Sequence, residues 1–167
     1  CLTGCLVDVA QTLQKFSNND NHQSIVSSIT KGEIYTSAIL EPLNHDPENP
    51  NTTAVFDDDK IIINGSKYLS EISSLAKGIL ISASSNKGVI LALVKTDNVK
   101  LTQLTSTANS PLFKVELKNV SIKESDVVHE EGRGLEALKY LLQINMVMRS
   151  YIALGVTNKM TSLIASY

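Results

Sequence analysis

The chain has 167 residues, of which 43% are apolar and 19% are charged, a composition typical of one globular domain or slightly more. Fifteen basic and seventeen acidic residues give a formal net charge of -2, which excludes the basic surface that a nucleic-acid partner would require. No apolar run approaches the roughly 18 residues of a membrane span, so we expect no membrane partner either.

The chain opens with two cysteines four residues apart, Cys1 and Cys5, and without the basic segment of a secretory signal. No further Cys or His cluster accompanies them, so we expect no metal site and interpret both as reduced thiols on one helix face. Reduced thiols favour a cytoplasmic location. Because no initiator methionine is present, we expect the chain to be a segment of a longer protein.

The first 32 residues have the apolar spacing of two helices. Apolar residues recur every three or four positions between residues 1 and 16, and a second, shorter apolar face follows. Asp20 or Asn21 is the expected cap of the second helix, and Gly32 is its expected end. We therefore expect residues 1–32 to form the end of an N-terminal helical domain.

Short apolar runs separated by turn residues follow between residues 33 and 131. Strands are expected over residues 33–40, 54–56, 60–64, 66–69, 99–104 and 112–120. Asn64 and Gly65 predict a tight turn between two of them. Residues 78–84 and 88–94 predict a hairpin whose unbroken apolar arms indicate that both of its faces are covered. The spacing predicts an antiparallel β-barrel or sandwich over residues 33–131.

From Gly132 the helical period returns and continues through residues 132–167. The apolar side chains lie nearly all round this helix, so it must be buried nearly all round. One sheet can cover only one side of it, so we expect either a homo-oligomer formed through this helix or further helices beyond Tyr167. The predicted fold class is therefore α+β, with a β domain flanked by N-terminal helices and by one long helix of an incomplete bundle.

Several sequence phrases occur in a characteristic order along the chain. Residues 36–42 (TSAILEP) end a strand, residues 61–67 (IIINGSK) carry an Asn-Gly-x-Lys phrase, and residues 113–120 form an apolar strand. Residues 132–135 open the last helix with two glycines, and residues 149–155 carry an Arg followed by Ala-Leu-Gly. In this order and spacing the phrases resemble the acyl-CoA dehydrogenase family. The resemblance implies the end of a helical domain, a complete middle β domain and the first helix of a C-terminal helical domain.

The resemblance also implies a cofactor and a substrate. Family members bind FAD between the β domain and the helices, and a carboxylate removes the α-proton of an acyl-CoA thioester while the flavin takes the hydride. The implied cofactor contacts lie at two strand ends and in one loop: Ile39, Leu40, His45, Leu69, Ser70 and Glu71. The implied substrate contacts are Asp46 and Arg149.

Three positions depart from the family pattern. Leu40 stands where the family has a threonine, Glu71 ends the stretch where it has Trp-Ile-Thr, and Met148 stands where some members carry the catalytic base. Other members hold that base farther downstream, so no catalytic residue is assigned and we expect the isolated chain to be inactive. Two functions stay open. The chain is part of an FAD-dependent acyl-CoA dehydrogenase-like oxidoreductase, or it is a flavin-free binding or assembly module derived from the same family.

Three charged or titratable side chains also have purely structural interpretations. Arg149, in an apolar helix, either contacts the CoA part of the substrate, reaches solvent, or pairs with Glu136 or Asp126. We interpret Glu41 as a strand-end carboxylate that accepts loop amide hydrogens, because no second titratable group is placed to work with it. His45 lies in a polar loop, and we expect its ring to be solvated.

Overall fold

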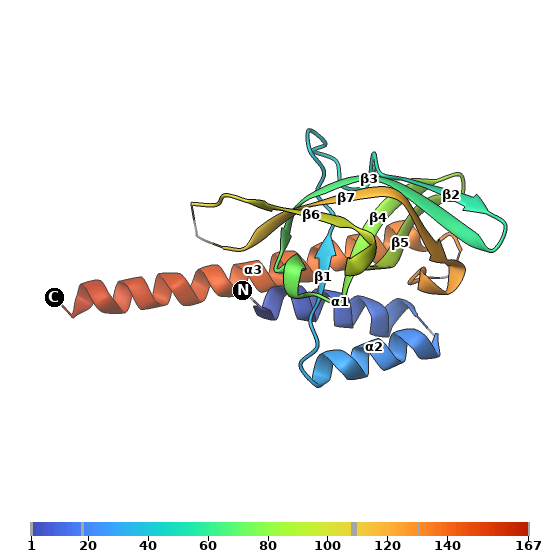
Figure 1. The fold of residues 1–167 in the computed structure, drawn as a ribbon. Coiled ribbons are helices and arrows are strands. Elements are labelled where there is room, and N and C mark those ends of the chain that lie inside the picture. The colour runs from blue at the N-terminus through green and yellow to red at the C-terminus, as the bar shows by residue number, and fades with distance from the viewer. Residues whose placement is uncertain (1, 18, 108–109, 130, 167) are drawn as a thin grey trace.

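The computed structural model describes the chain except residues 1, 18, 108–109, 130 and 167 and the side chains of residues 2–6. Helices, a curled sheet and one long helix follow one another along the chain (Figure 1). The predicted fold class is confirmed. The interpretation of Cys1 and Cys5 as reduced thiols concerns side chains outside the described set.

The N-terminal helices are α1 (Leu2–Phe16) and α2 (Asp20–Thr30). The predicted N-cap of α2, Asp20 or Asn21, was wrong because it lies one or two residues after the observed one. Asn19 is the cap, and its side-chain oxygen accepts a hydrogen bond of 2.8 Å from the backbone N–H of Asn21. Gly32 follows the helix end with φ +96, a conformation that favours glycine. Helix α1 packs against α3 and β1, and thereby connects the helical layer to the sheet.

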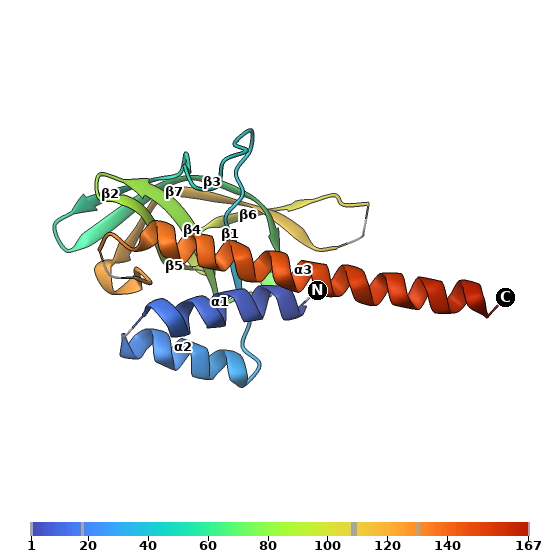
Figure 2. The same ribbon diagram turned by 180° about the vertical axis from the view of Figure 1, so that it is seen from behind.

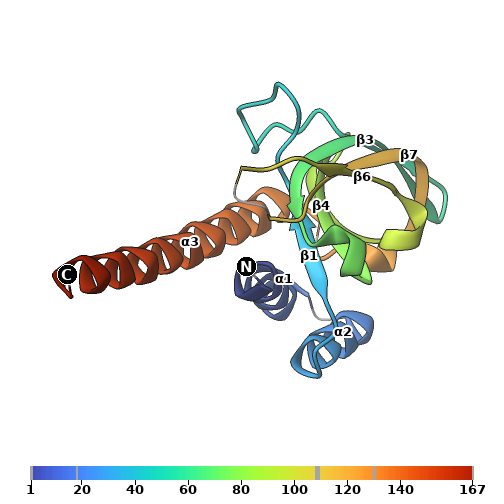
Figure 3. The ribbon, with the colours of Figure 1, turned by 60° about the vertical axis from the view of Figure 1, so that its left-hand side comes forward.

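The sheet is mixed and strongly curled, as the end-on view in Figure 3 shows. Its strands run in the order β1-β4-β2-β3-β7-β6, and β5 pairs with β4. The predicted hairpin β4–β5 is confirmed, but β1 pairs with β4 in parallel, so the sheet is not wholly antiparallel. The strands are β1 (Tyr35–Ala38), β2 (Thr53–Asp57), β3 (Lys60–Glu71), β4 (Gly78–Ser85), β5 (Gly88–Lys95), β6 (Lys100–Leu104) and β7 (Leu112–Lys123).

The expected turn at Asn64 and Gly65 was wrong, because β3 continues through both residues. A register shift with β7 lies at this point, so the two residues form a bulge and not a hairpin. A Cβ atom on Gly65 would lie 2.5 Å from Oγ1 of Thr52, so the glycine allows the residue before β2 to approach β3 closely. The side-chain oxygen of Asn64 accepts a hydrogen bond from the backbone N–H of Asn119 in β7.

Two apolar cores lie on the two faces of this sheet. One core fills the inside of the curl with side chains such as Ile63, Ile81 and Val115. The other lies between the outer face of β4 and β5 and the helices, and includes Leu13 and Leu138. Strands β4 and β5 contribute to both cores, which confirms that both faces of the hairpin are covered.

Helix α3 (Gly134–Ala165) crosses the molecule beside α1 and then extends beyond the sheet (Figures 1 and 2). A Cβ atom on Gly134 would lie 1.7 Å from the carbonyl oxygen of Val89, so only glycine lets the helix start against β5. Its buried residues all precede Leu142, so the expected burial nearly all round the helix does not occur in this chain. No described helix is both long enough and apolar enough to cross a bilayer.

The exposed apolar side chains of α3 predict that the purified chain self-associates or binds a hydrophobic dye. They include Tyr151, Leu154, Met160 and Ile164. We expect sedimentation to show an oligomer, and the double substitution Leu154→Lys/Ile164→Lys to shift the chain towards monomer and to reduce dye fluorescence. The matched control is Leu43→Lys, on an isolated loop side chain that is 97% exposed. A wild-type chain that is monomeric and does not bind the dye would contradict this prediction.

Candidate functional site

A groove of about 290 Å³ lies between the ends of β1 and β3 and the facing side of α3. Its walls combine apolar side chains from both sides, among them Leu112, Leu141 and Leu142, with polar groups at one end. Five of the positions selected from the sequence line this groove: Ile39, Leu40, Leu69, Glu71 and Arg149. Residues 30 to 110 positions apart in the sequence therefore meet at one site.

The end of β3 adopts an unusual backbone that presents these side chains. Leu69 and Ile72 both have φ +56, a left-handed conformation that is rare for leucine and isoleucine, and a register shift with β7 precedes Ser70. Such conformations cost about 1–3 kcal/mol each and persist where the surrounding structure fixes them, often at functional sites. The backbone N–H of Tyr68 donates to the carbonyl oxygen of Leu40 at 2.7 Å, which joins the two strand ends that line the groove.

Ser70 supports this backbone from beneath the groove. It is buried, its hydroxyl donates to the carbonyl oxygen of Ser37 at 3.1 Å, and it accepts a hydrogen bond from the Ser73 hydroxyl. It does not line the groove.

His45 and Asp46 lie in the loop after β1 and do not line the groove either. The His45 side chain is exposed, as expected from its polar surroundings. The Asp46 carboxylate accepts hydrogen bonds from the Asn49 side chain and the Glu48 backbone N–H. These bonds lower the pKa of Asp46 and give the loop its turn.

Arg149 joins α3 to the end of β3 across the groove. Its Nη2 donates to Oε1 of Glu71 at 2.9 Å, and its Nε donates to Oδ1 of Asn145 at 2.7 Å. Of the alternatives left open by the sequence, the pairing with Glu136 or Asp126 was wrong, and Glu136 instead accepts hydrogen bonds from Arg133. The Glu71 side chain is only 16% exposed and that of Arg149 is 62% exposed, so the guanidinium compensates a largely buried carboxylate.

Asp8 is a site residue that sequence analysis did not select. It is fully buried, and its Oδ2 accepts hydrogen bonds from the Ser37 hydroxyl at 2.9 Å and from Nδ2 of Asn145 at 3.0 Å. Burial raises the pKa of this carboxyl to about 6, although the hydrogen bonds act in the opposite direction. Its partners lie 29 and 137 residues away, so no local sequence signal identifies it.

Glu41 accepts hydrogen bonds from the backbone N–H groups of Asn51 and Thr52 at 2.6 and 2.9 Å, as expected. The expectation that no titratable group accompanies it was wrong. The fully buried Lys67 ammonium lies 2.6 Å from Glu41 Oε1 and also donates to Oγ of Ser82. This pair ties the loop after β1 to the middle of β3.

Hydrogen bonding and charge keep the Glu41–Lys67 pair ionised at neutral pH. Burial alone would raise the pKa of Glu41, but hydrogen bonds from Lys67 and Thr52 lower it to about 2. Burial lowers the pKa of Lys67 to about 8, against the opposing effect of Glu41. Between these two values both groups carry their charges.

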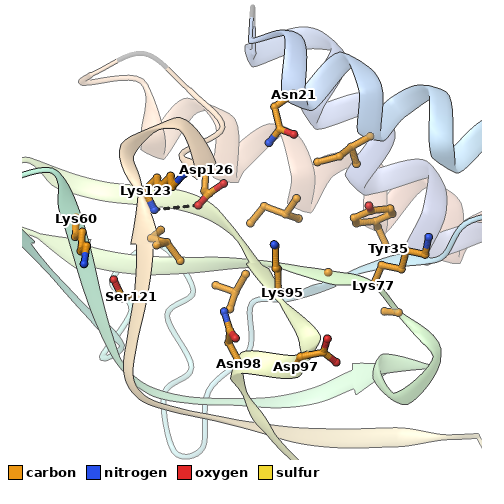
Figure 4. A pocket seen from close by; sticks show the side chains of 16 residues that line it. Asn21, Tyr35, Lys60, Lys77, Lys95, Asp97, Asn98, Ser121, Lys123 and Asp126 are labelled. Carbon is orange, nitrogen blue, oxygen red and sulfur yellow. Dashed lines mark hydrogen bonds between the residues drawn. The ribbon is translucent and has the colours of Figure 1, made fainter.

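A larger cavity lies elsewhere and has a different character. It measures about 730 Å³ and lies among α2, the β4–β5 hairpin and β7, as Figure 4 shows. Lys60, Lys95 and Lys123 line it together with Asp97 and Asp126, so cationic and anionic groups alternate around it. None of the positions selected from the sequence lines it. Within the described part of the chain, no group of three potential metal ligands occurs.

No protein-family model matches this chain, and no curated protein matches it. Solved structures do match. A glutaryl-CoA dehydrogenase from Mycobacterium smegmatis in complex with FADH2 superimposes with a TM-score of 0.78 at 20% identity, covering 86% of this chain and 39% of that chain. The prolyl acyl carrier protein oxidase AnaB gives 0.79 at 20% identity, with coverages of 86% and 42%.

A variant of the Tcur3481-Tcur3483 steroid ACAD gives a TM-score of 0.86 at 21% identity and covers 98% of this chain. That match extends over 44% of the other chain, so this chain spans less than half the length of the structures that it matches. The fold of the described residues is therefore that of acyl-CoA dehydrogenases and related flavoproteins.

Proposed function

We propose that this chain is part of an FAD-dependent acyl-CoA dehydrogenase-like oxidoreductase, and that the groove beside α3 takes the flavin ring, with the acyl thioester bound next to it. The observation that carries the proposal is the convergence of Leu40, Leu69, Glu71 and Arg149 on one groove. The sequence resemblance assigned these residues to the flavin and substrate contacts. The matching solved structures support the proposal through their common fold.

The groove fits one part of the cofactor. Ligand sites typically measure about 300–1,000 Å³, and a groove of about 290 Å³ lies just below this range. It has room for a flat ring system and not for a whole dinucleotide. Apolar walls suit the faces of such a ring, and the Glu71–Arg149 pair places compensated charges at its polar edge. When bound, the flavin would supply the redox chemistry.

Among the described residues, the groove provides no catalytic base. Met148 cannot accept a proton, and the Glu71 carboxylate is engaged by the Arg149 guanidinium. We therefore propose that the chain by itself does not dehydrogenate an acyl-CoA. Its own residues shape the ring site, fix the two strand ends and hold one cation beside the groove.

Titration with FAD, followed by the quenching of flavin fluorescence, tests the proposed ring site. We expect the wild-type chain to bind FAD. We also expect Leu40→Thr/Glu71→Thr, which introduces the residues typical of the family, to bind it about tenfold more tightly, or by about 1.4 kcal/mol. The double variant removes the carboxylate from the groove, while the hydrogen bond to Asn145 still holds Arg149. The matched control is Leu75→Thr, on an exposed apolar residue that does not line the groove.

The flavin-free binding module remains the alternative function. It predicts that neither the wild-type chain nor the double variant Leu40→Thr/Glu71→Thr binds FAD. Binding by the double variant alone would mean that Leu40 and Glu71 have closed a former flavin site.

A further inference from the structure

Four side chains form a continuous hydrogen-bonded network from the buried side of α3 to the groove. Oδ2 of Asp8 in α1 accepts from Nδ2 of Asn145 at 3.0 Å. Oδ1 of Asn145 accepts from Nε of Arg149 at 2.7 Å, and Nη2 of Arg149 donates to Glu71 at 2.9 Å. The network starts at a fully buried carboxyl and ends at a side chain that lines the groove.

The order of donors and acceptors gives the network a direction. An ionised carboxylate only accepts hydrogen bonds, so Asp8 requires the NH2 group of Asn145 on its side. The carbonyl oxygen of Asn145 must then face Arg149, where it is the acceptor for Nε. A protonated Asp8 carboxyl can itself donate a hydrogen bond. The NH2 group of Asn145 then no longer has to face Asp8. The Arg149 side chain is 62% exposed, so its anchor at Nε selects one orientation among many.

We propose that Asp8 is a positioning residue, which acts through Asn145 to hold the Arg149 guanidinium across the groove against Glu71. The hydrogen-bonded network is given by the structure itself, and only its effect on flavin binding rests on the proposed function. Protonation of Asp8 then releases Arg149 and weakens binding in the groove.

The surroundings of Asp8 allow its titration to be assigned. Arg149 of α3 is the charged group among the described residues whose field acts on Asp8, and Glu71 of β3 lies beyond it. Strand β1 contributes the uncharged hydroxyl of Ser37, and α1 contributes the backbone N–H of Val9. Because burial raises the pKa of Asp8 to about 6, the interval between pH 7.5 and pH 5 spans its protonation, and Asp8→Asn separates its effect from that of the histidines.

The two arginines of the chain make a direct test possible. In a protein labelled with ¹⁵N-arginine, Arg133 and Arg149 give separate Nε–H signals, and Arg133, which binds Glu136 on the same helix, is the internal reference. We expect the Arg149 signal to shift with a midpoint near pH 6, and below this pH to exchange with water faster relative to the Arg133 signal, which shows no such shift. Asp8→Asn should abolish the shift.

Asn145→Ala provides a second variant should Asp8→Asn fail to fold. It leaves the Asp8 carboxyl in place but removes the link, so the Arg149 signal should lose its pH dependence. An Arg149 signal that is independent of pH in the wild type, and unchanged in both variants, would overturn the proposal.

A parallel FAD titration separates this proposal from the proposed function. We expect the wild type to bind FAD about threefold or more tightly at pH 7.5 than at pH 5, and Asp8→Asn to show less than half of that change. If no variant binds FAD at either pH, the proposed function is wrong, and the Arg149 signal still decides whether Asp8 positions the guanidinium. If the Arg149 signal shifts with the protonation of Asp8 but the FAD affinity does not change with pH, the proposed effect of Asp8 on FAD binding is wrong.

Discussion

Replacing Lys67 by methionine is expected to lower the free energy of unfolding by about 3–5 kcal/mol, the usual cost of removing one partner of a buried ion pair. Methionine retains the length of the side chain but removes the ammonium. The Glu41 carboxylate, only 4% exposed, would then lack its cation and keep only uncharged partners, the two loop amides and the Asn44 side chain. Urea unfolding followed by circular dichroism at pH 7 measures the loss.

Two further variants identify the cause of this loss. In Glu41→Gln/Lys67→Met no buried charge remains, so we expect most of the stability to return. The matched control is Lys77→Met, which breaks an exposed pair with Glu33 and should change the free energy of unfolding far less, because solvent screens the pair. A loss at Lys67 no larger than the loss at Lys77 would show that the buried pair does not stabilise the loop.

The second large effect is a pH dependence of stability caused by Asp8. Its pKa rises from 3.8 in the unfolded chain to about 6 in the fold, so the folded state binds the proton more tightly. The stabilisation of the fold by the protonated Asp8 carboxyl is therefore fully present below about pH 4 and is lost as the pH rises through 6. At 1.36 kcal/mol per pKa unit, the loss amounts to about 3 kcal/mol between pH 4 and pH 8.

Asp8→Asn isolates this contribution from other titrating groups. Burial lowers the pKa of His22, which stabilises the fold as the pH rises and partly masks the effect of Asp8 in the wild type. His22 is present in both proteins, so the difference between their unfolding free energies reports Asp8 alone. We expect that difference to change by about 3 kcal/mol across the window, and Asp59→Asn at the exposed β2–β3 turn to show no such change. Parallel curves for wild type and Asp8→Asn would contradict the assignment.

The elements predicted correctly are those set by local patterns. The helical periods before residue 32 and after Gly132, and the hairpin of β4 and β5, follow from side chains a few positions apart. The turn predicted at Asn64 and Gly65 was wrong. Their sequence is typical of a tight turn, whereas the observed bulge depends on pairing with β7, more than 50 residues away. The parallel pairing of β1 with β4 likewise joins residues that are far apart in the sequence, so no local pattern predicts it.

The site was predicted in part for the same reason. The resemblance selected Leu40, Glu71 and Arg149, which meet at the groove, but the pairing of Arg149 with Glu71 joins residues 78 positions apart. Lys67 and Asp8 were missed because nothing near them in the sequence shows that they are buried. Their partners come from other elements, at separations of 26 and 137 residues.

The measurement that tests the central claim most directly is a ¹H–¹⁵N NMR titration of the chain with FAD, followed residue by residue. The proposed ring site predicts signal changes at residues 38–40 and 69–71 and at the Nε–H of Arg149, with little change around Lys60 and Lys95 in the larger cavity. Changes confined to that cavity, or none at millimolar FAD, would contradict the assignment of the groove as a flavin site.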